Sequence, residues 1–170
     1  MSILTTAATA LAATLIGAYA IGQFTSRSIN TEITIDAPAE AVWSELADTD
    51  AHSEWNPFIR SFSGVLEVGN RLEVTVQPEG KSPMSFTPTV LVSEEARELR
   101  WVGRLGFQGI FDGEHFFILE ANDNGTTTFR HGERFSGMLA YALFPLIGAD
   151  TAKGFEAMNR ALKERVEAGA

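Results

Sequence analysis

The sequence predicts a domain of the α+β class, in which a curved antiparallel sheet packs around one long C-terminal helix. Residues 149–167 carry an apolar stripe at helical spacing, and their charged residues fall mostly on the other side. The stripe consists of Phe155, Met158, Leu162 and Val166. Residues 29–135 read mainly as strands separated by turns. A single long helix after a run of strands is expected to bury its stripe on their sheet.

The ends of this helix carry the residues that commonly cap helices. Asp150 or Thr151 is predicted to cap its first turn, and Gly169 lies just past its predicted end. We therefore expect the space between this helix and the sheet to form the functional site.

The composition excludes several classes of protein. The chain has 170 residues, of which 45% are hydrophobic and 21% are charged, and its formal net charge is −9. A surface this acidic argues against a nucleic-acid partner, because phosphate contacts need clustered lysine and arginine. The absence of cysteine excludes disulfides, thiol nucleophiles and thiolate metal sites.

An apolar segment, residues 1–26, precedes the domain. No charged residue occurs from Ser2 to Ser26, and the 22-residue stretch 3–24 has about the length of a membrane-spanning helix, roughly 20 residues. The first interpretation is a single-pass membrane anchor that carries the domain. The second is a signal peptide cleaved after residues 18–20, giving a secreted or periplasmic protein, although no basic residue precedes the apolar run. The third is a helix packed on the domain itself.

Seven strands and two short helices are expected in the order of the chain. The predicted strands are 31–36, 58–66, 71–77, 84–93, 98–104, 109–121 and 126–135. A short helix at 38–46 and one further turn within 48–55 follow the first strand. Pro88 lies inside the fourth strand, which suggests a bulge or an edge location there.

The last two strands are predicted to form a hairpin with a defined register. A three-residue loop, 123–125, with Gly125 in the left-handed region, brings the apolar faces of both strands to the same side. Counting back from this loop sets the facing pairs. These are Asn122 with Thr126, Leu119 with Phe129, Phe117 with His131, His115 with Glu133, and Gly113 with Phe135.

Several short motifs stand out along the chain. They are Ile35-Asp-Ala-Pro38 followed by Val42-Trp43, Glu54-Trp-Asn-Pro-Phe58, Phe111-Asp-Gly-Glu-His115, His131-Gly-Glu-Arg-Phe135 and Gly154-Phe-Glu-Ala-Met-Asn159. Together these motifs resemble the SRPBCC or START-related superfamily, in its polyketide cyclase/dehydrase branch. The resemblance implies one domain over residues 27–168 with a helix-grip fold: seven antiparallel strands around a long C-terminal helix, and two short helices after the first strand. Members of the superfamily bind lipids, hormones and polyketides, and a few catalyse cyclisation or hydroxylation.

His115 and Glu133 are the candidate catalytic residues, because the register places them side by side on an inward face. A buried histidine beside a carboxylate can act as a general base or hold a ligand hydroxyl. The ordinary alternative is that these two polar side chains only pair with each other in the interior and have a purely structural role. His131 could join them as a metal ligand, but no local ligand motif supports this, and we expect neither a metal nor a cofactor.

A set of mostly aromatic residues is predicted to line an apolar ligand site. The candidates are Trp55, Phe58, Trp101, Phe107, Phe111, Gly113, His115, Phe117, His131, Glu133, Phe135, Phe155 and Met158. Some of them are expected to be ordinary core. Phe116 and Ile118 fall on the opposite face of their strand, where they could meet the N-terminal helix, a partner or a bilayer.

The sequence leaves three functional hypotheses. The first is a module that binds a small hydrophobic or amphipathic ligand between sheet and helix. The second is a cyclase or dehydratase acting on a polyketide-like substrate, with His115 and Glu133 as acid and base. The third is a membrane-tethered interaction domain with no open pocket. A cavity of roughly 300 Å³ or more would favour the first two.

Overall fold

The computed structural model describes residues 3–169, with side chains at 7–22 and 25–169. Its elements, in chain order, are α1 (Ile3–Phe24), β1 (Ser26–Ile35), α2 (Ala39–Ala47), α3 (His52–Trp55), β2 (Ile59–Ser63), β3 (Glu73–Val76), β4 (Met84–Phe86), β5 (Thr89–Glu94), β6 (Glu98–Arg104), β7 (Asp112–Ala121), β8 (Thr127–Ser136) and α4 (Ala140–Gly169). The α+β class, the long C-terminal helix and the two short helices after the first strand are confirmed.

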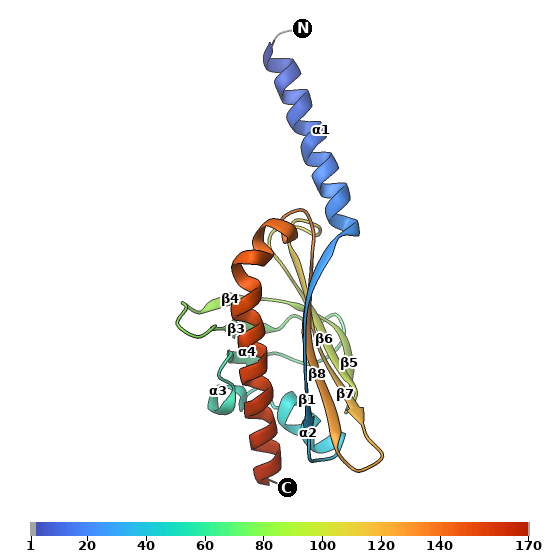
Figure 1. Cartoon of the computed structure of the whole chain (residues 1–170), viewed down its shortest axis with the longest axis vertical. Helices are drawn as coiled ribbons and strands as arrows, with labels where there is room; N and C mark the ends of the chain where they lie inside the picture. Colours follow the sequence, from blue (N-terminus) through green and yellow to red (C-terminus); the bar gives the residue numbers. More distant parts are fainter. Residues whose placement is uncertain (1–2, 170) are drawn as a thin grey trace.

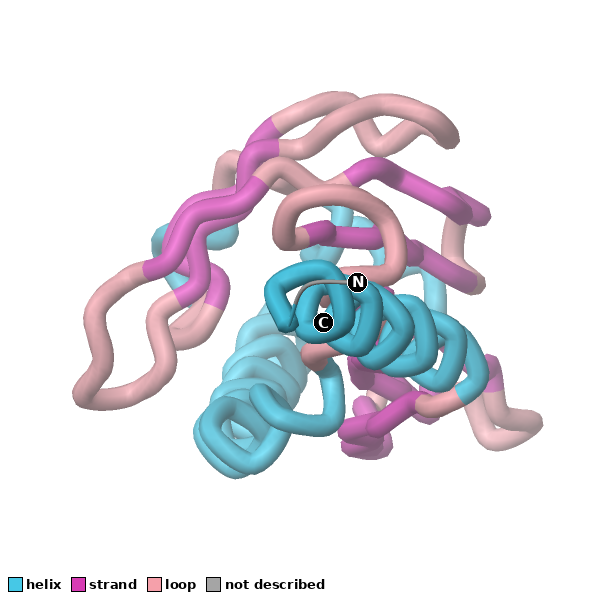
Figure 2. The backbone as a smooth tube through the Cα atoms, turned by 90° about the horizontal axis from the view of Figure 1, so that it is seen from above, coloured by secondary structure: helices cyan, strands magenta, loops and turns pink. Residues whose placement is uncertain are grey.

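The strands form two antiparallel sheets in the described part of the chain. One has five strands in the order β1-β8-β7-β6-β5, and the other has three in the order β2-β3-β4. Figure 1 shows α4 running along the strands, and Figure 2 shows the strands from above as an arc around the helices. The helix-grip arrangement is therefore present, and both sheets contribute to it.

The prediction of one seven-stranded sheet is wrong, and Pro88 accounts for the difference. The strand expected at 84–93 is divided at residues 87–88 into β4, which pairs with β3, and β5, which pairs with β6. Proline has no N–H with which to continue a ladder. The Pro88 carbonyl instead accepts a hydrogen bond from the Leu72 amide at 2.9 Å, and an isolated bridge between Arg71 and Thr89 connects the two sheets.

Helix α4 is longer than predicted, because it begins at Ala140 rather than at residue 149. Pro145 lies inside its first turns, where proline usually interrupts a helix, and Figure 1 shows a bend in this part of α4. Asp150 and Thr151 are therefore interior residues and not caps, and Gly169 is the last helical residue.

The apolar stripe of α4 is buried as predicted. Phe155, Met158 and Leu162 are fully buried, and Val166 is 4% exposed. They join the core that β1, β2, β3 and β5 to β8 contribute from the concave side. Burial of this stripe fixes α4 on the sheets and determines which α4 residues face the site.

Helix α1 extends away from the domain (Figure 1). Its contacts lie at its C-terminal end, where the Tyr19 hydroxyl donates to the Gln108 carbonyl at 3.3 Å and the Gly22 carbonyl accepts from the Gly137 amide at 3.1 Å. Within the described residues, no helix has both the length and the hydropathy needed to cross a membrane. The predicted membrane anchor is therefore not supported by the structure.

Candidate ligand site

The hairpin of β7 and β8 has the predicted register. His115 faces Glu133, Phe117 faces His131 and Gly113 faces Phe135. The turn also matches, because Gly125 has a φ of 84° and the Asn122 amide donates to the Thr126 carbonyl at 2.8 Å. A slip of one residue would turn the inward face to solvent, so burial of its aromatic rings fixes the register.

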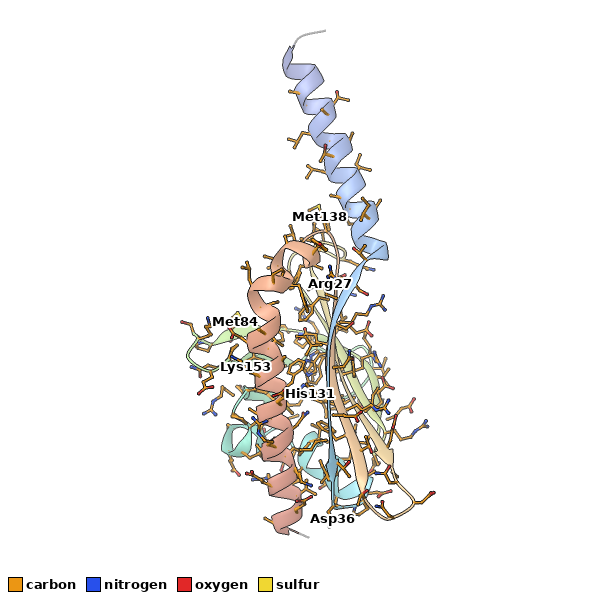
Figure 3. All side chains as sticks on the ribbon, viewed as in Figure 1. Arg27, Asp36, Met84, His131, Met138 and Lys153 are labelled. Carbon is orange, nitrogen blue, oxygen red and sulfur yellow. The ribbon has the colours of Figure 1, made fainter. Side chains whose placement is uncertain are left out.

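A chain of polar side chains crosses the interior from β1 to β8. Asn159 of α4 contacts Thr31 at 2.9 Å and His131 Nδ1 at 2.8 Å. His131 Nε2 lies 3.0 Å from His115 Nε2. His115 Nδ1 in turn lies 3.8 Å from the Glu133 carboxyl, which is too long for a hydrogen bond. Figure 3 shows His131 between α4 and the five-stranded sheet.

Aromatic rings surround both histidines. The His115 ring stacks on Trp101 with 4.7 Å between the centroids, and the His131 ring stacks on Phe155 at 3.9 Å. Phe117 contacts both imidazoles, with centroid distances of 4.8 Å and 4.7 Å. These rings exclude water from the imidazoles and leave them few polar partners.

Burial makes the polar chain uncharged near neutral pH. Loss of solvation lowers the pKa of His115 to about 3 and lowers the pKa of His131 well below its usual value. Burial also raises the pKa of Glu133 to about 8. The Glu133 side chain keeps 19% of its surface exposed, so this end of the polar chain is reached by solvent. An acid and a base, both neutral, thus lie side by side.

No described set of three acidic or histidine side chains is arranged to hold a metal ion. His115 and His131 use their facing Nε2 atoms to bond each other. His131 and His115 therefore pair with each other, and Glu133 lies beyond hydrogen-bonding distance of His115.

A groove of about 530 Å³ opens beside α4. Its wall on the helix consists of Asp150, Lys153, Gly154 and Ala157, which share one face of α4. Its opposite wall is formed by residues 57–60 and 77–80, at the start of β2 and after β3. Lys153 points to the side of α4 on which β3 and β4 lie (Figure 3).

Phe58 separates this groove from the polar chain. Its ring covers Gly154, where any Cβ atom would overlap it. The ring also meets Phe155 edge to face at 5.5 Å, and Phe155 stacks on His131. Two aromatic rings therefore lie between the groove and the histidines.

A second buried polar network holds the wall at residues 57–60 in place. The Asn56 side chain accepts hydrogen bonds from the amides of Phe58, at 3.0 Å, and Ile59, at 2.8 Å. Its amide nitrogen contacts His52, whose other ring nitrogen bonds the Leu46 carbonyl at 2.8 Å. Because all these groups are buried and paired, the segment that carries Phe58 is held in one conformation.

Comparison with known proteins places the chain in a family. The model of the family described as "Polyketide cyclase / dehydrase and lipid transport" matches residues 26–168. The chain belongs to this family. The match confirms the resemblance stated above and covers all the elements that build the groove and the polar chain.

Solved structures of several other proteins share the fold. The Zhui aromatase/cyclase from Streptomyces sp. R1128 is 17% identical with a TM-score of 0.67, over 84% of this chain and 94% of that one. A START superfamily protein from Mycobacterium smegmatis is 19% identical with a TM-score of 0.64, over 84% and 99%. Norcoclaurine synthase from Thalictrum flavum is 14% identical with a TM-score of 0.65, over 88% and 92%. The search of curated proteins found no match.

In this member of the family, the predicted apolar ligand-site residues are spread over the core, its edge, the surface and the groove. Trp101, Phe117, Phe135, Phe155 and Met158 are buried in the core around the histidines. Trp55 and Phe111 are half-buried at its edge, and Phe107 is 70% exposed on the loop before β7. Phe58 is the member of the predicted set that lines the groove.

Sequence reasoning missed Asn159, Thr31 and the opposite wall of the groove. Asn159 is 2% exposed and lies next to Met158, so it belongs to a helix face that looks simply apolar. A buried histidine needs a polar partner, and Asn159 is the polar residue of that α4 face, which is the signal that could have found it. The groove joins segments that are distant in sequence, so no local pattern indicates it.

Phe116, predicted to face outward, is covered by its neighbours in the sheet. Its ring lies against Gly132 and beneath the Arg100 guanidinium, 5.1 Å from the ring centroid. Arg100 is held in turn by Glu98 and Glu114, each at 2.6 Å. A contact with α1 is therefore not needed to explain this apolar residue.

Proposed function

We propose that this protein binds a small hydrophobic or amphipathic ligand between α4 and the sheets. The observation that carries the proposal is the groove of about 530 Å³ whose inner wall is Phe58. Pockets that hold small ligands commonly have roughly 300–1,000 Å³, with apolar walls and a few polar groups. Family membership supports the same class of function.

The groove offers an amphipathic surface. Pro57, Phe58 and Pro78 supply apolar wall. Arg60 and Lys153 supply positive charge, and Glu79 and Asp150 supply negative charge. An apolar ligand body would be held mainly by the area it removes from water, at about 25 cal/mol per Å². Displacement of both the Phe58 and the Phe155 rings would connect the groove to the histidines behind them.

Binding of 8-anilinonaphthalene-1-sulfonate, measured by fluorescence, tests this proposal. Ala157→Trp fills the groove from the helix side and should weaken binding at least tenfold. Ala168→Trp is the matched control, because Ala168 is exposed near the end of α4 and away from the groove. Equal affinities in both variants, with unchanged circular dichroism, would refute binding in the groove.

A second candidate is acid–base catalysis on a polyketide-like substrate. The observation that favours it is the neutral His115 beside a carboxyl group that keeps its proton up to about pH 8. Once ionised, a carboxyl group with a pKa of about 8 can remove a proton next to a carbonyl and return it elsewhere, whereas an imidazole with a pKa of about 3 is too weak a base for this step. Hydrogen–deuterium exchange of 1-phenylbutane-1,3-dione, followed by NMR, should be faster with the wild-type protein than with Glu133→Gln. Identical rates would exclude this role for Glu133.

A further inference from the structure

The hydrogen bonds of the buried polar chain have a defined direction, which begins at Thr31. The Thr31 hydroxyl lies 2.9 Å from the backbone carbonyl of His131, which can only accept. Its proton is therefore directed to that carbonyl, and its oxygen accepts from the Asn159 amide nitrogen at 2.9 Å. This fixes the Asn159 side chain, so that its oxygen faces His131 Nδ1.

The direction continues through both imidazoles. An amide oxygen only accepts, so His131 Nδ1 carries a proton, and the neutral ring presents a lone pair at Nε2. His115 must then donate from its own Nε2 across the 3.0 Å contact. Because His115 is also neutral, its Nδ1 is left with a lone pair that faces Glu133 at 3.8 Å.

We propose that Thr31 and Asn159 are positioning residues that hold His115 as a hydrogen-bond acceptor, and that the ligand group taken up between His115 and Glu133 is a hydroxyl. A hydroxyl oxygen about 2.8 Å from both side chains fits the 3.8 Å separation of their facing atoms. It would donate to His115 Nδ1 and accept from the protonated Glu133 carboxyl.

This arrangement distinguishes chemical classes of ligand. Phenols, enols and alcohols have the proton that His115 Nδ1 requires, whereas ethers and ketones leave this buried acceptor unpaired. The ligand half of the proposal rests on the proposed binding function. The histidine half is independent of any ligand.

The tautomers are measured first, on the full chain without ligand. Long-range ¹H–¹⁵N correlation spectra distinguish a ring nitrogen that carries a proton from one that carries a lone pair. The proposal expects the proton on Nδ1 of His131 and on Nε2 of His115. The reverse assignment in either ring would overturn it.

Three variants test whether Thr31 sets these tautomers. Thr31→Val removes the hydroxyl with little change in shape, frees the Asn159 amide to turn over and should populate both tautomers. Thr31→Ser should restore the wild-type pattern. Thr34→Val, on the same strand but exposed, should leave it unchanged. Wild-type tautomers in Thr31→Val would show that Thr31 has no positioning role.

The ligand class is then tested with 2-naphthol and 2-methoxynaphthalene, which differ in the hydroxyl proton. Wild-type protein should bind 2-naphthol about tenfold more tightly, and Thr31→Val should reduce this preference. Equal affinities in wild-type protein would overturn the hydroxyl site and leave the binding function intact. Binding of neither compound would contradict the binding function itself, whatever the tautomers are.

Discussion

His115, His131 and Glu133 lie on an inward face. There, the cost of burying a charge outweighs the gain from forming an ion pair. His115 and Glu133 are separated by 3.8 Å, yet the environment favours the neutral form of each. The reason is that Trp101, Phe117 and Phe155 replace water around the imidazoles, and transfer of a charge into such surroundings is costly.

The pKa of Glu133 predicts how stability changes with pH. The unfolded chain loses this proton near pH 4.5 and the folded protein near pH 8, so Glu133 lowers the free energy of unfolding as pH rises between these values. The histidines act in the opposite sense, because their folded pKa values are lowered, and their effect ends near pH 6.5. Stability should therefore be highest near pH 6.5.

Between pH 6.5 and 8 the contribution of Glu133 should fall by about 1–2 kcal/mol, toward the lower value because water reaches Glu133, and the end of the histidine titration offsets part of this loss. Urea denaturation of wild-type protein and Glu133→Gln at both pH values measures it. The variant should show little loss over this range. A loss of the same size in Glu133→Gln would mean that another group is responsible.

Gly113 gives a second prediction for a single residue. A Cβ atom at this position would overlap the Glu133 carboxyl, whereas one at Gly103, the facing residue of β6, meets only Phe86 at 3.7 Å. Gly113→Ala should therefore move Glu133 and lower its pKa toward the ordinary value. Carboxyl ¹³C NMR titration measures this, and Gly103→Ala is the control. An unchanged Glu133 titration in Gly113→Ala would contradict the assigned contact.

Among the elements, the β7–β8 hairpin could be predicted from sequence and the ends of α4 could not. Alternation and one glycine turn were enough for the hairpin, because only one register buries both apolar faces. Pro145 concealed the first turns of α4, since proline usually ends a helix. The division of the fourth strand at Pro88 was foreseen only as a bulge or an edge.

Helix α4 supplies a prediction about packing. Met158 is fully buried in the core, so Met158→Ala should lower the free energy of unfolding by about 2–5 kcal/mol. Equilibrium denaturation measures the change, and Glu156→Ala at an exposed position of the same helix is the control. A loss below about 1 kcal/mol would mean that Met158 borders an open cavity.

At the scale of the whole molecule, the groove is the feature that no part of the sequence indicates. Its walls come from the start of β2, from residues 77–80 and from one face of α4, which only the folded chain brings together. The polar chain likewise needs β1, β7, β8 and α4 in their final places. Family membership could be predicted from motifs, whereas these contacts depend on tertiary structure.

The separation of α1 from the domain gives a prediction for the whole chain. Among the described residues, the hydrogen bonds between α1 and the domain lie at Tyr19 and Gly22, and β1 begins at Ser26. A chain that starts at Thr25 should therefore fold with a Tm within a few degrees of the full chain. A large drop in Tm would show that α1 stabilises the domain. Cell fractionation of the full chain is the separate test of the anchor predicted from sequence.

Binding of a ligand between α4 and the sheets is tested by an NMR titration of the full chain with 2-naphthol. Backbone shifts should concentrate at Gly80, Lys153 and Gly154, and the ring signals of His115 and His131 should respond at the same ligand concentration. Shifts confined to α1 and to the exposed residues Phe107 and Tyr141, with the groove and the histidines unaffected, would contradict it.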